Sequence, residues 1–108
     1  MASGILGSSD LSAGSDTSVY TVPADTYSVV TVSFVNRGAS TSNIRLAVPT
    51  SATPSGADYL EYDVSLGPNG VLERTGIVAQ ADRQIVVRSS AASVTAVVMG
   101  IETAVPAS

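Results

Sequence analysis

The chain has 108 residues and a formal net charge of −4, and it contains no His, Cys, Lys or Trp. These missing residue types supply most general bases, activated nucleophiles, Schiff-base amines and transition-metal ligands. We therefore expect no enzymatic activity, no cofactor and no bound metal. The five arginines are scattered, which argues against a nucleic-acid partner. No apolar run approaches the roughly 20 residues that span a bilayer, so we expect no membrane partner either.

Residues 1–16 are small, polar and rich in Gly and Ser, with Ile5, Leu6 and Leu11 as isolated apolar residues. This composition predicts an extended N-terminal arm outside a folded domain that covers residues 17–108. An arm of this kind is ordered more easily by a neighbouring subunit than by its own few side chains. The segment therefore favours an assembly.

From residue 17 onward, short segments of alternating apolar and polar residues predict seven or eight strands. The predicted strands cover residues 17–22, 27–36, 43–48, 58–66, 71–74, 77–78, 84–89 and 93–103. Turn signals such as Pro23 and the Asn69-Gly70 pair separate them. Short strands at this spacing are typical of an all-β fold, here a single antiparallel β-sandwich or jelly-roll-like domain.

The alternation also predicts which side chains point into the sandwich. In the segment 43–48, Ile44 and Leu46 point inward and Arg45 points outward. In the segment 58–66, the pattern places Tyr62 in the core and Tyr59 on the surface. Tyr59 and Arg45 are therefore the candidate surface contacts.

The last predicted strand, 93–103, is apolar on both faces. Either it lies centrally in the sandwich and is covered on each side, or its second face meets another subunit. In the second case the strand and the arm together supply a candidate subunit interface. That interface comprises Ile5, Leu6, Leu11, Val97, Met99 and Ile101.

Glu61 and Asp63 form the closest carboxylate pair, and their spacing places them on one face of a strand. Such a pair could serve glycoside hydrolysis or help to bind Ca²⁺. The favoured interpretation is a solvated strand face next to an arginine, because two groups on one strand cannot flank a bond from opposite sides. The dispersed tyrosines are a weak signal of glycan binding.

Several segments together resemble small β-sandwich virion structural proteins of tailed bacteriophages. These segments are 19–24 (VYTVPA), 35–38 (VNRG), 44–47 (IRLA), 57–63 (ADYLEYD), 69–76 (NGVLERTG) and 86–89 (VVRS). The resemblance implies a capsid decoration (cement) protein on the capsid surface, which binds the major capsid protein as a homo-oligomer, a trimer. The alternative within the same family is a tail fibre or baseplate module that contacts tail proteins and host glycans.

Overall fold

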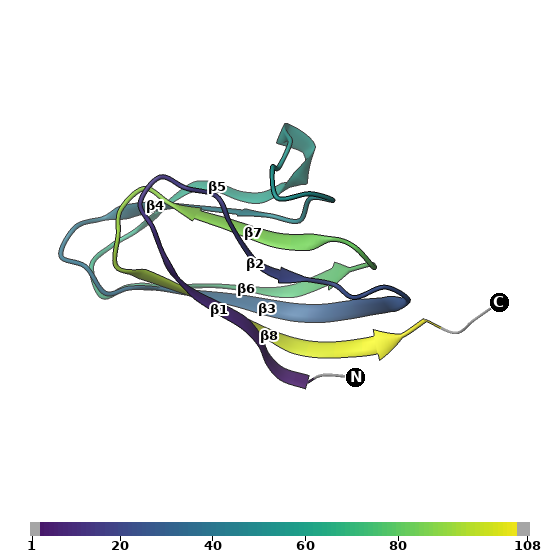
Figure 1. The fold of residues 1–108 in the computed structure, drawn as a ribbon. Helices are drawn as coiled ribbons and strands as arrows, with labels where there is room; N and C mark the ends of the chain where they lie inside the picture. The colour runs from purple at the N-terminus through teal and green to yellow at the C-terminus, as the bar shows by residue number, and fades with distance from the viewer. Residues whose placement is uncertain (1–2, 106–108) are drawn as a thin grey trace.

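The computed structural model describes residues 3–105, which form eight strands in two four-stranded antiparallel sheets (Figure 1). The strands are β1 (Ser3–Leu11), β2 (Thr17–Thr21), β3 (Thr26–Asn36), β4 (Ser42–Ala47), β5 (Tyr59–Leu66), β6 (Val71–Ala79), β7 (Gln84–Ser89) and β8 (Val94–Ala104). One short 3-10 helix, η1 (Gly56–Asp58), precedes β5. The predicted all-β sandwich is confirmed.

The strand order is that of a jelly roll. One sheet, which we call sheet A, has the order β1-β8-β3-β6, and the other, sheet B, has the order β2-β7-β4-β5. The first half of the chain pairs with the second half as one long antiparallel hairpin, whose successive strand pairs are β4–β5, β3–β6, β2–β7 and β1–β8. This hairpin curls so that β3 also pairs with β8 and β4 also pairs with β7, which produces the two sheets.

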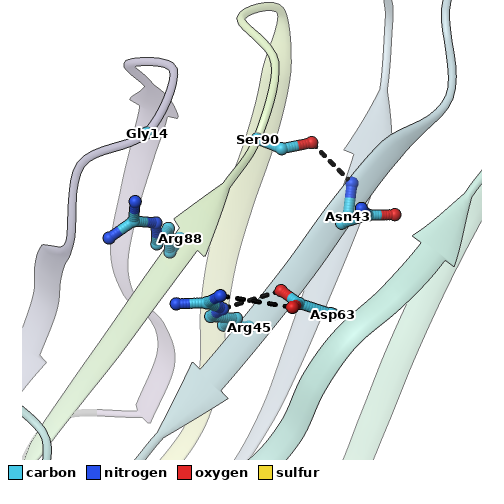
Figure 2. Close-up of a pocket in the computed structure, with 6 residues that line it drawn as sticks. All are labelled: Gly14, Asn43, Arg45, Asp63, Arg88 and Ser90. Atoms are coloured by element: carbon cyan, nitrogen blue, oxygen red, sulfur yellow. Dashed lines mark hydrogen bonds and ion pairs between the residues drawn. The ribbon is translucent and has the colours of Figure 1, made fainter.

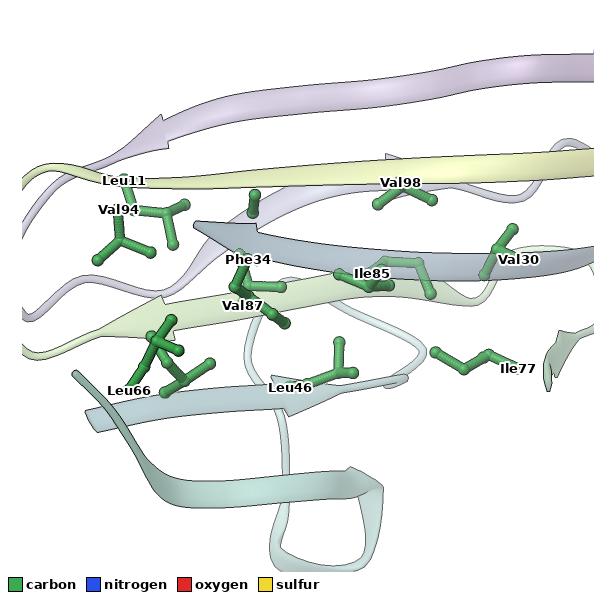
Figure 3. Packing of buried hydrophobic residues seen from close by; sticks show 13 residues of the cluster. Leu11, Val30, Phe34, Leu46, Leu66, Ile77, Ile85, Val87, Val94 and Val98 are labelled. Atoms are coloured by element: carbon green, nitrogen blue, oxygen red, sulfur yellow. The ribbon is translucent and has the colours of Figure 1, made fainter. Parts of the chain in front are cut away.

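The core lies between the two sheets and consists mainly of β-branched and Leu side chains (Figure 3). Along β3 every second residue is buried, as the alternation predicts, and Val32 and Phe34 are fully enclosed. The buried cluster comprises Leu11, Val30, Val32, Phe34, Ile44, Leu46, Leu66, Ile77, Ile85, Val87, Val94, Ala96 and Val98. Both sheets contribute to it, so neither sheet is a separate folding unit.

The prediction of an arm outside the sandwich is wrong for Ser3–Leu11, which is the edge strand β1 of sheet A. Pairing with β8 satisfies the backbone groups on one side of this segment and holds it in the sheet together with its few apolar side chains. Leu11 is buried in the core and Leu6 packs against it. Gly7 allows β1 to approach β2, because a Cβ there would lie 2.3 Å from the carbonyl oxygen of Val19.

In β5 the predicted side-chain direction is wrong for Tyr62, because a β-bulge interrupts the alternation, whereas Leu66 beyond the bulge is buried as predicted. Ile44 is opposite Val64, but Leu46 is opposite Glu61, so β5 has one extra residue between these pairs. Asp63 lies within the bulge with a positive φ of 53°, which Asp tolerates better than most residues. As a result Tyr62, predicted in the core, is 57% exposed.

A polar link connects the two sheets near the end of β2. The Tyr20 hydroxyl donates a hydrogen bond to Glu102 Oε2 of β8 (2.6 Å) and shares a second one with Ser28 Oγ of β3 (2.7 Å). Burial and the bond to Glu102 raise the pKa of Tyr20 to about 12. The link therefore ties sheet B to sheet A with a neutral tyrosine at physiological pH.

Candidate functional site

The outer face of sheet A bears a group of apolar side chains that the rest of the described chain leaves exposed or half-buried. We call it the outer apolar patch; it comprises Ile5, Tyr27, Val29, Val78, Met99 and Ile101. The strand register places Ile101, Val29 and Val78 directly opposite one another across β8, β3 and β6. In the neighbouring row, Ile5 of β1 lies opposite Met99. The patch is therefore continuous across all four strands of sheet A.

Charged side chains on this face gather at the other end of the sheet. Asp10 and Arg37 form an ion pair there, and Arg37 also donates a hydrogen bond to Thr95. Between the two ends, Glu73 and the half-buried Val97 lie on either side of Ser33 in one row across the sheet. The ion pair of Asp10 and Arg37 thus lies at the opposite end of this face from the outer apolar patch, and the exposed Val71 lies at the same end as the ion pair.

The six residues predicted as a subunit interface divide into two groups. Ile5, Met99 and Ile101 belong to the outer apolar patch, and Val97 is half-buried on the same face. Leu11 is part of the core, and Leu6 packs against it. No layer of the described chain covers the outer face of β8, so the strand is central within its sheet without being enclosed on both sides.

Sequence reasoning missed Tyr27, Val29 and Val78 as members of this patch. Strict alternation along β3 places Val29 on the face opposite Val30, so the signal was present for that residue. The alternation did not indicate Val78, because β6 contains a bulge near Gly76, whose φ is +71°. Only the register between β3 and β6 shows that Val29 and Val78 are neighbours.

The outer face of sheet B carries a different kind of site, an open pocket of about 300 Å³ between the ends of β4, β5 and β7 (Figure 2). Its lining comprises Gly14, Asn43, Arg45, Asp63, Arg88 and Ser90. Arg45 and Arg88 are directly opposite each other on adjacent strands. A polar pocket with two arginines suits an anionic or hydroxyl-rich ligand.

Arg45 is held in place by two neighbours from β5. Its guanidinium donates two hydrogen bonds to the Asp63 carboxylate, from Nε (2.7 Å) and from Nη2 (3.2 Å). It also lies 4.2 Å from the centre of the Tyr62 ring, within cation–π range. The bonds from Arg45 lower the pKa of Asp63, and those to Asp63 raise the pKa of Arg45. Both groups are therefore charged at neutral pH.

Of the two predicted surface contacts, Arg45 is the one that lines the pocket. Tyr59 is half-buried and contacts the exposed Tyr62 edge to face, with ring centres 4.9 Å apart. The bulge in β5, which a period-two pattern does not reveal, brings Tyr62 and Asp63 next to Arg45. Sequence reasoning therefore missed Tyr62, Asn43 and Arg88 at this surface.

The predicted shared face of Glu61 and Asp63 is not observed. Asp63 binds Arg45 of β4, whereas Glu61 lies 3.4 Å from Arg74 of β6 in the other sheet. The bulge separates the two carboxylates, so they do not form an acid–base pair. Within residues 3–105, no group of three or more Asp or Glu side chains could hold a metal ion.

Comparison of the chain with family models, curated proteins and solved structures finds no match. Among the described residues, no helix has the length and apolar character that crossing a membrane requires.

Proposed function

We propose that the chain is a non-enzymatic structural protein of a tailed-bacteriophage virion, a capsid decoration (cement) protein that assembles as a homotrimer on the major capsid protein. The observation that carries this proposal is the outer apolar patch. Contiguous apolar surface of this kind on a protein usually marks a contact with another chain. The jelly-roll order, and the resemblance of several sequence segments to phage virion proteins, support the proposal.

In this proposal the outer apolar patches of three copies meet around the trimer axis. The patch lies on strand residues, so the contact surface is rigid and needs little ordering on assembly. Each trimer then presents its other surfaces to the capsid three times. Several weak contacts of this kind add up through effective concentration, so each one can be small.

The proposal is tested by finding where the chain lies in purified particles of the phage that encodes it. Cryo-electron microscopy should show many copies over the threefold or local threefold axes of the head lattice. The isolated chain should also have the mass of three copies in sedimentation equilibrium. A monomer in solution together with absence from the head would refute the proposal.

A second candidate is a tail fibre or baseplate module that contacts host glycans. The pocket around Arg45, with exposed Tyr62 beside it, favours this candidate, because polar pockets flanked by aromatic rings suit sugars. The same micrographs separate the two candidates. A few copies confined to the tail would support the second and refute the first.

A further inference from the structure

Two arginines from adjacent strands face the pocket on sheet B, and each has one carboxylate partner. Arg45 and Arg88 are directly opposite on β4 and β7, where like charges oppose strand pairing. They are two of only five cations in a chain with a net charge of −4. Figure 2 shows both side chains on the same side of the sheet, facing the pocket. Asp63 and Asp16 balance this charge, so the carboxylate of a ligand would have to compete with them for the two guanidinium groups.

The two guanidinium groups differ in how firmly their acidic partners hold them. Arg45 makes two hydrogen bonds to Asp63 and lies against Tyr62. Arg88 lies 3.8 Å from Asp16, which is too far for a hydrogen bond. Arg88 can therefore turn its planar donors toward a carboxylate at little cost, because a bidentate pair is stronger than this long contact.

The rest of the lining offers groups that bind hydroxyls. The Asn43 side chain supplies an amide, Ser90 a hydroxyl, and Asp63 a carboxylate fixed by Arg45. None of the six lining residues has an apolar side chain. An acidic peptide would find no pocket for an apolar anchor here, whereas a sugar ring would find partners for several of its hydroxyls.

We propose that this pocket binds a carboxylate-bearing saccharide. Its carboxylate pairs with Arg88, and its ring hydroxyls bond to Asp63, Asn43 and Ser90. The contact with Tyr62 and the two hydrogen bonds to Asp63 hold the Arg45 guanidinium, so that the Asp63 carboxylate stays in one position as an acceptor. The proposal deepens the second candidate function and does not depend on assembly through sheet A, because the pocket lies on the opposite sheet.

The test is an NMR titration of the whole chain with trigalacturonate, and with its methyl ester as a probe of equal size without charge. We expect trigalacturonate to shift the backbone amides of Asn43, Arg88 and Ser90, and the ester to bind at least about tenfold more weakly, since hydrogen bonds between charged groups are the strong ones. Arg88→Gln should weaken the binding of trigalacturonate by a similar factor. Arg37→Gln, which removes an exposed arginine of sheet A, is the matched control and should leave binding unchanged.

Three results would overturn the proposal. The first is equal binding of the acid and the ester, and the second is an absence of shifts at the pocket. The third is equal binding of a triglutamate peptide, which would assign the pocket to acidic peptides. Asn43→Ala serves as the second variant if Arg88→Gln fails to fold. The position of the chain in the virion is measured separately, so a failure here leaves head or tail placement to be decided on its own.

Discussion

Removal of one side chain from the outer apolar patch should weaken self-association without unfolding the chain. Val78 keeps 67% of its surface exposed and Ile101 keeps 52%. Complete burial of such a side chain is worth about 1.5–3 kcal/mol. Covering only the exposed part in an assembly therefore contributes about 1–2 kcal/mol per side chain and per copy. Val78→Ser or Ile101→Ser should thus weaken association by about five- to thirtyfold per copy.

The assay is sedimentation equilibrium over a range of chain concentrations, with thermal unfolding of each variant measured in parallel. Val71→Ser is a matched control, because Val71 is 61% exposed on the same strand but lies at the other end of sheet A. It should associate like the unsubstituted chain. If all three variants associate equally, or if only Val71→Ser weakens association, the outer apolar patch is not the interface.

Two further predictions concern the stability of the sandwich. Tyr20→Phe removes the hydroxyl shared with Ser28 and Glu102, which should cost about 1–3 kcal/mol of unfolding free energy at neutral pH. The pKa of Tyr20 is raised to about 12 in the folded chain, so the extra stability of the unsubstituted chain over Tyr20→Phe is complete below pH about 10 and is lost as the pH rises through 12. The unfolding free energies of the two chains should therefore converge near pH 12. A difference that does not depend on pH would contradict this reasoning. Gly100→Ala places a Cβ 2.1 Å from the carbonyl oxygen of Val29, a backbone atom that cannot rotate away. The substitution should lower the unfolding free energy measured in urea by about 3 kcal/mol, which is at the upper end for overpacking. A decrease below about 1 kcal/mol would show that β8 and β3 separate easily to make room for the added methyl group.

Regular alternation made part of this fold predictable from local sequence. In the middle of β3, Val30, Val32 and Phe34 alternate with polar residues and are buried as expected. The period of two forces successive side chains to opposite faces, so a strand that keeps the alternation has predictable faces. Turn residues between the strands then favoured an all-β sandwich or jelly roll. The double-faced apolar pattern of 93–103 likewise marked Met99 and Ile101 as surface candidates.

Features that depend on pairing between distant segments were not readable in this way. The Gly/Ser-rich N-terminal segment is too polar to predict a strand, and it becomes β1 only because β8, some 90 residues later, offers an unpaired edge. The bulge at Asp63 leaves no mark in the alternation, yet it turns Tyr62 outward and separates Glu61 from Asp63. A single extra residue reverses every face beyond it, and local sequence does not record which strand will face which.

The sequence by itself determined that the chain forms strands, that Val, Ile and Leu build its core, and that it lacks the residues of most catalytic centres. These properties follow from composition and from a period of two, which are local. The tertiary structure alone decided that Ile101, Val29 and Val78 meet on one face and that Arg45, Arg88 and Asp63 surround one pocket. Both surfaces join residues from several strands, and the register that places these residues together is set by the packing of the whole sandwich.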